Sequence, residues 1–577
     1  MPAFSRGVYT PSLLDPYGQG SGLQGDQFTD QDYGLPPPMV ADTSGASGQG
    51  GTSATVAASG NQLIDGLLTG VRWAGGSITY TDPDAAGDYQ AGYFVDVNGN
   101  SISAQNEGFS HISAGQLLAV HYALNVSNYT QPLGAVGFSV EGFTGLDITY
   151  GGANLGTGTI RVANTSDNLY GYTYYPANSI YGGDAWMGTN IQSPVQGNYD
   201  WNNTIHELGH ALGLKHGHQT GGPANVALPS DHDSLEFTVM TYRSYIGAPL
   251  TGYTNGTWDY PQTYMMLDIQ ALQYMYGADF SVNSGDTTYT WSPTTGQSFV
   301  NGNLATNPGS GIGGAANRVF MTIWDGGGVD TYDLSNYTTS MTIDLRPGEW
   351  STFDTAQLAN LDGVGGHMAR GNVANALQYN GDGRSLIENA NGGSGNDTLI
   401  GYDGNDRLSG GSGNDTLEGD AGTDVIAGGT GADRIFGGSG ADIITGGVGD
   451  DEIFADHDGS PTSLQGRDNI YGGGNADLMF GNAGADQFIF DTANDFVFGH
   501  ADVVGDFSHA EGDKIVLTPV DARSDLVGNQ NFTFVDGPST QAGTLWLGAV
   551  SDGTQHVFMN VNGGAADLDI LVKFHDP

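Results

Sequence analysis

Three histidines and one glutamate in the segment HELGHALGLKH have the types and spacing of a catalytic metal site. Histidines four residues apart lie on one face of a helix, so His206 and His210 can present their imidazoles to one ion, with Glu207 facing the adjoining position. We expect Gly213 to adopt a positive φ that ends the helix and lets His216 reach the same ion. Three imidazoles and one open position for water suit a hydrolytic zinc ion.

A second motif, EFTVMTY, follows the third histidine and ends at Tyr242. Together with the zinc motif it resembles the metzincin peptidases and, among them, the serralysins. The resemblance implies that Met240 lies beneath the zinc and that Tyr242 can ligate the ion and then stabilise the developing oxyanion. The serralysins usually have proline after the third histidine, whereas this chain has Gly217 and then His218, which we interpret as an exposed loop histidine.

The resemblance covers roughly residues 60–577. The segments LIDGLLTGVRW (63–73) and SITY (77–80) are similar to the start of the serralysin catalytic domain. Upstream of the zinc motif, LYGYTYYP (169–176) alternates and breaks at proline, which predicts an edge strand. In the family that edge binds substrate, and a peptide added as a further strand would be held through its main chain.

The implied reaction is peptide-bond hydrolysis without a covalent intermediate. Zinc would polarise the scissile carbonyl and activate a water molecule, while Glu207 would take the proton and deliver it to the leaving amine. Nucleophilic designs have little support, because the chain has no cysteine and no G-x-S-x-G elbow in a strand-to-helix context. The absence of cysteine also excludes a cysteine-switch propeptide.

A nine-residue repeat runs without interruption from Gly392 to Phe454. Its units are GGSGNDTLI, GYDGNDRLS, GGSGNDTLE, GDAGTDVIA, GGTGADRIF, GGSGADIIT and GGVGDDEIF. Every unit has glycine at positions one and four, aspartate at position six and an aliphatic residue at position eight. The units resemble RTX nonapeptides, which implies a calcium-binding parallel β-roll. We expect the eighth-position residues to form its core: Leu399, Leu408, Leu417, Ile426, Ile435, Ile444 and Ile453.

The sixth-position aspartates are the predicted calcium ligands. They are Asp397, Asp406, Asp415, Asp424, Asp433, Asp442 and Asp451, joined after a break near Pro461 by Asp468, Asp477 and Asp486. Stacked carboxylates repel one another until calcium neutralises them, so we expect the roll to fold only with calcium. The net charge of -48 agrees with ion binding and disfavours nucleic acid and anionic membrane as partners.

Between the two motifs lies a segment that resembles the serralysin calcium sites joining the catalytic domain to the roll. The resemblance assigns ligands to Asn283, Gly285, Thr287, Asp325, Gly327, Gly328, Asp330 and Glu388. Asn283 stands where the family usually has arginine, but that position donates a backbone carbonyl. Residues 355–384 match the family poorly and have no predicted role.

The expected architecture is an α/β zincin-like (metzincin) catalytic domain followed by an all-β parallel β-roll with a β-rich cap. We predict a propeptide or disordered segment at 1–59, the zinc protease domain at 60–280, a calcium-binding joining segment at 281–390, the RTX roll at 391–490 and the cap at 491–577. No apolar run reaches 18 residues, so no membrane span is expected.

The start of the chain lacks the apolar core of an export signal. RTX resemblance therefore implies type I secretion from a Gram-negative bacterium, with the signal within residues 491–577. The expected protein is a secreted monomer with one catalytic zinc and several structural calcium ions, acting on protein or peptide substrates. Its other expected partner is the type I secretion machinery. Whether a dedicated protein inhibitor also binds it is left open by the sequence. The alternative is a calcium-dependent RTX binding or adhesion protein with a silent zincin domain.

Overall fold

The chain divides into two compact units. Unit 1 contains residues 1–284, 294–326 and 358–385, and unit 2 contains residues 285–293, 327–357 and 386–577. The computed structural model describes residues 51–89, 94–95, 101–102, 108–125, 136–153, 157–166, 168–456, 466–490, 501–517, 533–535, 538–542, 544–548, 550, 554–560 and 568–574. Most of the predicted propeptide and parts of the predicted secretion signal lie outside these residues. The predicted joining segment, 281–390, contributes residues to both units.

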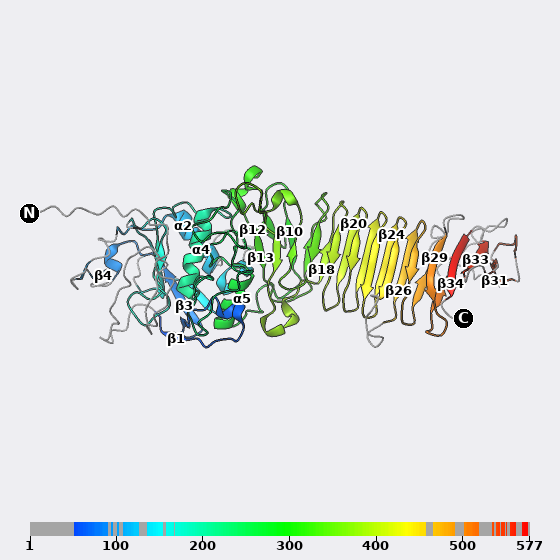
Figure 1. Cartoon of the computed structure of the whole chain (residues 1–577), viewed down its shortest axis with the longest axis horizontal. Helices are drawn as coiled ribbons and strands as arrows, with labels where there is room; N and C mark the ends of the chain where they lie inside the picture. The colour runs from blue at the N-terminus through cyan, green and yellow to red at the C-terminus, as the bar shows by residue number, and fades with distance from the viewer. Residues whose placement is uncertain are drawn as a thin grey trace, which may run out of the picture. The chain divides into compact units, whose positions relative to one another are not determined.

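Unit 1 is built on a five-stranded sheet with helices beside it (Figure 1). The strand order is β6 (Asp147–Tyr150), β3 (Ser77–Thr81), β7 (Ile160–Asn164), β9 (Ala185–Met187) and β8 (Tyr172–Thr173). Parallel pairing joins β3 to both β6 and β7, and β7 to β9, whereas β8 is antiparallel to β9. The prediction of an edge strand before the zinc motif is therefore confirmed by β8.

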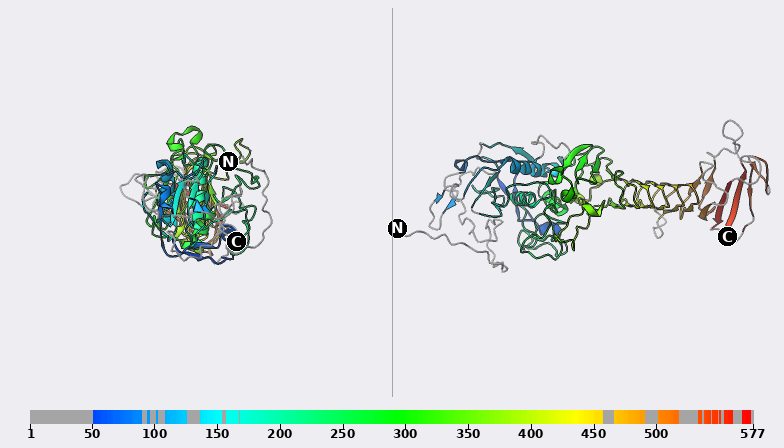
Figure 2. Two further views of the ribbon diagram at one scale, coloured as in Figure 1. Left: turned by 90° about the vertical axis from the view of Figure 1, so that its left-hand side faces the viewer. Right: turned by 90° about the horizontal axis from the view of Figure 1, so that it is seen from above.

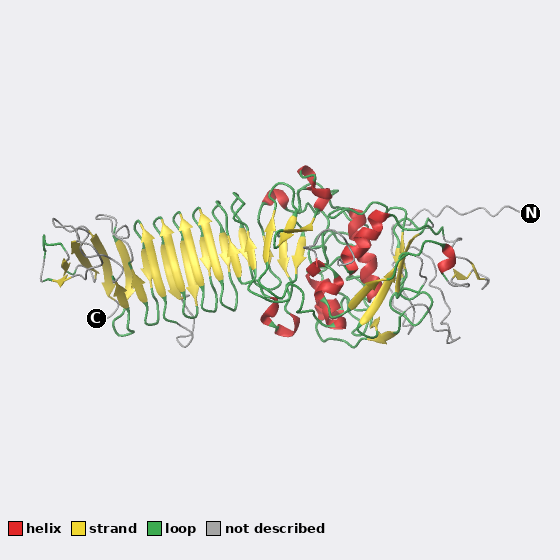
Figure 3. Cartoon of the chain, turned by 180° about the vertical axis from the view of Figure 1, so that it is seen from behind, coloured by secondary structure: helices red, strands yellow, loops and turns green. Residues whose placement is uncertain are grey.

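The helices of unit 1 are α1 (Gln62–Asp65), α2 (Ala114–Leu124), α3 (Val140–Phe143), α4 (Tyr199–Leu212) and α5 (Met266–Tyr276). Its remaining strands are β1 (Ser53–Thr55), β2 (Val71–Trp73), β4 (Phe94–Val95), β5 (Ser101–Ile102), β11 (Ser298–Val300), β12 (Asn303–Thr306), β13 (Met321–Ile323) and β17 (Val373–Asn375). Figure 3 shows the longer helices of this unit beside the sheet. Within the described residues, no helix is both long enough and apolar enough to cross a bilayer.

An aromatic cluster anchors the edge of the sheet. Tyr172 and Tyr174 pack with Trp186 and Tyr89 on one face of the sheet, and all four side chains are buried. Because side chains alternate along a strand, Thr173 and Tyr175 point to the opposite face, where α4 lies. The packing of the aromatic face therefore orients the side chain of Thr173 towards α4, the helix that carries the zinc motif.

Unit 2 consists mainly of two long sheets that take strands alternately (Figure 1). One sheet contains, in order, β10 (Thr288–Trp291), β14 (Thr331–Asp333), β18 (Asn389–Asn391), β20 (Arg407–Ser412), β22 (Val425–Thr430), β24 (Ile443–Val448), β26 (Asn469–Gly474), β28 (Gln487–Ile489) and β30 (Lys514–Val516). The other contains β15 (Thr342–Asp344), β19 (Thr398–Ile400), β21 (Thr416–Glu418), β23 (Arg434–Gly438), β25 (Glu452–Asp456), β27 (Leu478–Phe480), β29 (Asp502–Phe507), β34 (Leu568–Phe574), β33 (Thr554–Asn560), β32 (Thr544–Leu547) and β31 (Thr533–Phe534). The short strand β16 (Trp350–Ser351) also belongs to unit 2.

The nine-residue repeat explains this alternation. Successive strands of one sheet are two repeat units apart, so Leu417 pairs with Leu399 on one side and Ile435 on the other. All seven predicted eighth-position residues are at most 1% exposed, which confirms the predicted core. Figure 2 shows the repeat strands from above as a regular ladder of short turns. The last strands differ, because β33 pairs antiparallel with both β32 and β34.

Candidate metal centre

Helix α4 holds two of the three predicted metal ligands. It begins after Asn198, whose side chain accepts a hydrogen bond from the backbone N–H of Trp201 at 2.8 Å. It ends at Gly213, which has φ +108°, as predicted. A Cβ at this position would lie 2.3 Å from the carbonyl oxygen of Val71, so both the conformation and the close packing require glycine. The chain then turns back and brings His216 to the helix.

The three histidines converge through their Nε2 atoms. The Nε2 of His216 lies 3.2 Å from that of His206 and 3.1 Å from that of His210, and all three residues are at most 2% exposed. Ligands about 2.0–2.1 Å from a tetrahedral zinc ion are about 3.3 Å apart, so the spacing fits zinc. Among the described residues, this is the one group of three such side chains with ligand atoms close enough to hold a metal.

Hydrogen bonds to carbonyl oxygens orient two of the imidazoles. The Nδ1 of His206 lies 2.7 Å from the carbonyl oxygen of Val239, and that of His210 lies 2.7 Å from the carbonyl oxygen of Leu214. Since a carbonyl only accepts, each Nδ1 carries the proton and each Nε2 presents a lone pair to the centre. The donor set is therefore that of a metal site.

Glu207 is 1% exposed and lies beside the edge strand. Its Oε2 accepts a hydrogen bond of 2.7 Å from the Oγ1 of Thr173 in β8. The ring of Tyr175, from the same segment, meets the ring of His210 edge-on, with centroids 5.5 Å apart. The edge strand thus contacts both the carboxylate and one imidazole of the centre.

Met240 and Tyr242 both lie close to the histidine centre. Met240 is fully buried against Gly209 of α4, where an added Cβ would lie 2.6 Å from the methionine sulfur. The ring of Tyr242 has its centroid 4.5 Å from that of His216.

His218 is half-buried. The centroid of its ring lies 5.4 Å from that of His216, on which it stacks, and 5.1 Å from that of Tyr242. The interpretation of His218 as an exposed loop residue is therefore wrong, because the turn folds its ring against the centre.

A buried carboxylate supports the segment beneath the centre. Asp268 of α5 accepts hydrogen bonds from Thr238 Oγ1 at 2.5 Å, Val239 N at 2.8 Å and Met265 N at 3.0 Å. Burial raises the pKa of Asp268 to about 6. Because the carbonyl of Val239 holds His206, Asp268 supports the imidazole through the backbone of a single residue, Val239.

Part of the segment without a predicted role packs on the loop after Tyr242. The rings of Tyr245 and His367 stack with centroids 3.8 Å apart. The backbone N–H of Arg370 donates to Glu236 Oε1 at 3.0 Å, and the hydroxyl of Thr254 donates to the carbonyl of Leu361 at 2.8 Å. Residues 358–370 therefore contact the chain both before and after Met240 and Tyr242, at Glu236 on one side and at Tyr245 and Thr254 on the other.

Several of the predicted joining-segment calcium ligands come together within unit 2. Asp330 accepts from the backbone N–H of Thr287 through Oδ1 at 2.7 Å, and its own N–H donates to Glu388 Oε2 at 2.7 Å. The hydroxyl of Thr287 donates to the carbonyl of Gly285 at 2.9 Å. Gly328, with φ +149°, passes close to Gly285 and Asp330, and Gly327 precedes it at φ +138°. Asn283, with φ +50°, and the buried Asp325 belong to unit 1.

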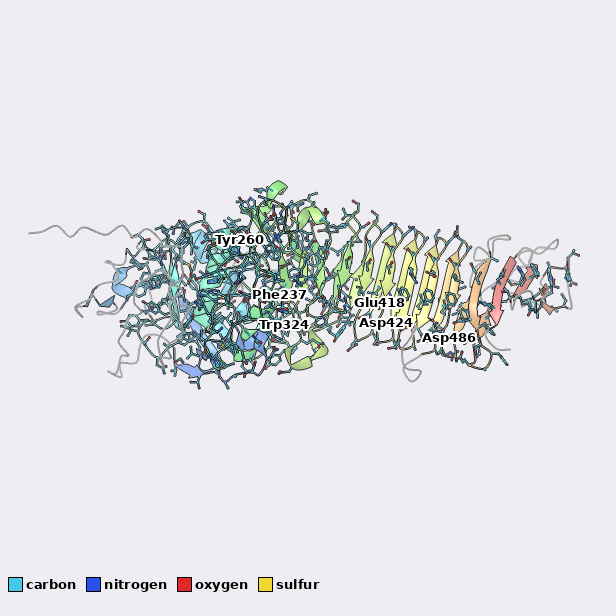
Figure 4. The ribbon with its side chains drawn as sticks, in the orientation of Figure 1. Phe237, Tyr260, Trp324, Glu418, Asp424 and Asp486 are labelled. Carbon is cyan, nitrogen blue, oxygen red and sulfur yellow. The ribbon has the colours of Figure 1, made fainter. Side chains whose placement is uncertain are left out.

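The sixth-position aspartates of the repeats form a ladder. From Asp415 onward, the Oδ1 of each accepts from the backbone N–H of the aspartate one full turn earlier, as Asp433 does from Asp415 at 2.8 Å. The ladder includes all ten predicted aspartates, every one of them at most 4% exposed. Figure 4 labels two members, Asp424 and Asp486, at the same edge of the repeat strands.

The second carboxylate oxygens of this ladder fit calcium. The Oδ2 atoms of seven aspartates are buried without a hydrogen-bond partner: Asp415, Asp424, Asp433, Asp442, Asp451, Asp468 and Asp486. Burial raises the pKa of Asp415 to about 7 and of Asp424 to about 8, and neighbouring carboxylates add to the rise. A row of buried, unpaired hard oxygens is the donor set that Ca²⁺ prefers.

Sequence reasoning missed three residues of these sites. Asp502 and Asp513 continue the ladder, accepting from the N–H groups of Asp477 at 2.9 Å and Asp486 at 3.1 Å. In a regular turn the two bonded aspartates are 18 residues apart, whereas Asp502 and Asp513 follow their partners by 25 and 27 residues. The nine-residue period therefore does not mark them. Thr173 carried no signal in the sequence beyond its place on a predicted edge strand.

A buried centre of three imidazoles with an adjacent carboxylate defines a metal site of the hydrolytic type. The family model described as Peptidase M10 serralysin C terminal matches residues 278–576, more than half of the 577 residues, so the chain belongs to this family.

Curated relatives agree with this assignment. The chain is 32% identical to Serralysin G of Dickeya chrysanthemi over 41% of this chain and 44% of that protein. It is 33% identical to Serralysin of Proteus mirabilis over 44% and 46%, and 30% identical to Metallopeptidase AprA of Pseudomonas marginalis over 43% and 49%. The chain spans less than half the length of these relatives.

Proposed function

We propose that this chain is a secreted zinc endopeptidase of serralysin type, whose C-terminal half is folded and stabilised by calcium. The observation that carries the proposal is the convergence of three buried imidazoles, with Glu207 buried beside them and held by Thr173. A structural or adhesive role needs neither an open metal position nor a carboxylate next to it.

His206, His210 and His216 would hold the zinc ion. When bound, zinc supplies a polarised scissile carbonyl and a water molecule whose pKa falls towards about 7. Glu207 accepts the proton of the attacking water and passes it to the leaving amine. Tyr242, with its ring beside His216, donates to the oxygen on which negative charge develops.

The edge strand β8 provides the proposed substrate site. Its outer side has no neighbouring strand among the described residues of the five-stranded sheet, and Thr173 and Tyr175 place it directly beside the centre. An extended peptide that adds to β8 would present a main-chain carbonyl to the metal. Because main-chain hydrogen bonds do not depend on side chains, this mode favours broad sequence preference.

Calcium binding by the repeat aspartates would make folding of unit 2 conditional on the ion. The buried Oδ2 atoms make the ion-free fold costly, and several calcium ions would offset that cost. This arrangement suits export through type I machinery as an unfolded chain and folding in extracellular calcium. Secretion, a monomeric state and control by a dedicated inhibitor are parts of the proposal that rest on the family.

Hydrolysis of casein by calcium-refolded protein tests the function. We expect activity to disappear with 1,10-phenanthroline in excess calcium and to return when zinc is added. The matched control is 1,7-phenanthroline, which has the same rings but cannot chelate. Activity that survives zinc removal would contradict a zinc mechanism, and inactivity of folded, zinc-loaded protein would favour the binding-protein alternative.

A further inference from the structure

The repeat is interrupted just after β25, and an aspartate stands at the interruption. Asp456 is the last residue of β25 and pairs in register with Gly438 of β23. Gly438 holds the second position of its repeat unit, so Asp456 places a carboxylate where the preceding unit of the same sheet has no side chain. Asp456 is not one of the sixth-position aspartates.

Asp456 is fully buried, and only one of its oxygens is hydrogen-bonded. Oδ2 accepts from the backbone N–H of Ala483 at 3.2 Å, whereas Oδ1 is buried without a partner. Burial raises the pKa of this carboxyl to about 7; Asp486 and Asp442 add to the rise, and the backbone N–H groups of Ala483 and Gly466 oppose it. The charged groups that act on Asp456 are thus other carboxylates, and an ionised Asp456 needs a cation.

A second unpaired oxygen comes from the next turn of the same column. Asn482, adjacent to Ala483, holds the second position of its unit with φ +62°, and its Oδ1 is also buried without a partner. The backbone N–H of Asn482 is already used, since it donates to Asp506 Oδ2 at 2.8 Å. Asp456 and Asn482 therefore place two unpaired oxygens on consecutive turns.

We propose that Asp456 and Asn482 hold an additional calcium ion at the interruption of the repeat. A carboxylate and an amide carbonyl are hard oxygen donors of the kind that Ca²⁺ takes in flexible sites. The ion would close the turn at which nine-residue periodicity is lost, where the sixth-position ladder must bridge 26 residues from Asp442 to Asp468. The proposal rests on calcium binding by the repeats in general and adds one ion to it.

Counting bound calcium tests the proposal. The full-length protein, saturated with calcium and freed of excess ion by dialysis, should contain one calcium ion more than either Asp456→Asn or Asp456→Gly. The glycine variant restores the usual repeat residue and the asparagine variant keeps the side-chain shape, so both should fold. Asp403→Asn, which removes an exposed carboxylate of the same region, should bind as many ions as the wild type.

Urea unfolding supplies a second readout that a merely structural role would not produce. Without calcium, Asp456→Asn should unfold at higher urea concentration than the wild type, because an unpaired buried carboxylate is removed. With calcium, it should unfold at lower concentration. Equal calcium content, or an unfolding midpoint that shifts in the same direction in both conditions, would overturn the site. A wild type that binds no calcium would instead overturn the calcium role of the whole repeat region.

Discussion

The hydroxyl of Thr173 donates a hydrogen bond of 2.7 Å to Oε2 of Glu207, and both residues are buried. This contact links the edge strand to the carboxylate that we propose as the general base. It holds one oxygen of Glu207 in place and so restricts how the carboxylate can rotate. The same strand would bind substrate, so one β-strand positions both the base and the peptide.

Replacing Thr173 with valine should therefore impair catalysis. Valine keeps the shape of threonine but removes the hydrogen bond to a charged group, which is worth about 1.5–3 kcal/mol. We expect kcat/KM for a peptide substrate to fall by about tenfold or more, mostly through kcat. Thr173→Ser, which keeps the hydroxyl, should recover most of the activity. A valine variant with wild-type kcat/KM would show that Glu207 needs no such support.

Tyr242→Phe should lower kcat with little change in KM. The phenol lies beside His216, and its proposed hydrogen bond forms only as charge develops on the scissile oxygen. Loss of one such donor typically reduces the rate by about 100-fold or more. Steady-state kinetics with zinc content measured in parallel would separate this role from metal binding. A drop in zinc content that accounts for the lost activity would favour tyrosine as a ligand instead.

We expect the first repeat position to tolerate only glycine, because a side chain there would collide with the neighbouring sixth-position carboxylate. A Cβ on Gly428 would lie 2.4 Å from Oδ2 of Asp433 and 2.7 Å from the carbonyl of Gly446, whereas one on Gly474 would meet nothing within 4 Å. Gly428→Ala should therefore weaken calcium binding and lower the urea midpoint in calcium, with about 1–3 kcal/mol lost. Gly474→Ala is the matched control. Equal midpoints for the two variants would contradict this account.

The ion-free repeat region should lose stability as the pH rises. Burial raises the pKa of Asp424 and of Asp486 to about 8 from an ordinary value of 3.8. A carboxyl whose pKa is raised by folding contributes stability that is complete below pH 4 and is lost as the pH passes 8. Urea midpoints in calcium-free buffer should therefore be higher at pH 5 than at pH 8.

The same carboxyls must ionise to bind calcium, so calcium binding at pH 7 should release protons. Titrations in two buffers with different ionisation enthalpies would count the protons released. No proton release, together with a pH-independent midpoint, would contradict the assigned pKa shifts.

Local patterns predicted the parts of the sites that depend on short spacing. The helical spacing of His206 and His210 and the need for positive φ at Gly213 follow from the chain itself, and the structure has both. Thr173 escaped prediction because its partner, Glu207, is 34 residues away and is reached only through sheet packing. His218 was misjudged for a similar reason, since its stacking on His216 depends on how the turn folds.

In the repeat region, too, local spacing predicted some features and not others. Period nine predicted the buried aliphatic core and the sixth-position ladder, because each turn repeats the same local geometry. Asp502 and Asp513 lie beyond the region where the period holds, so no local pattern marks them. Asp456 sits at the break itself and becomes noticeable only through its buried, unpaired oxygen.

The most direct test of the central claim is the rate of peptide-bond cleavage by Glu207→Gln compared with the wild type, both folded in calcium and loaded with zinc. Glutamine keeps the size and the hydrogen-bonding reach of the side chain but cannot take a proton from water. We predict equal zinc content and a kcat at least about 100-fold lower for the variant, within the range of general acid–base catalysis. Cleavage at the wild-type rate by the zinc-loaded variant would contradict the proposed mechanism.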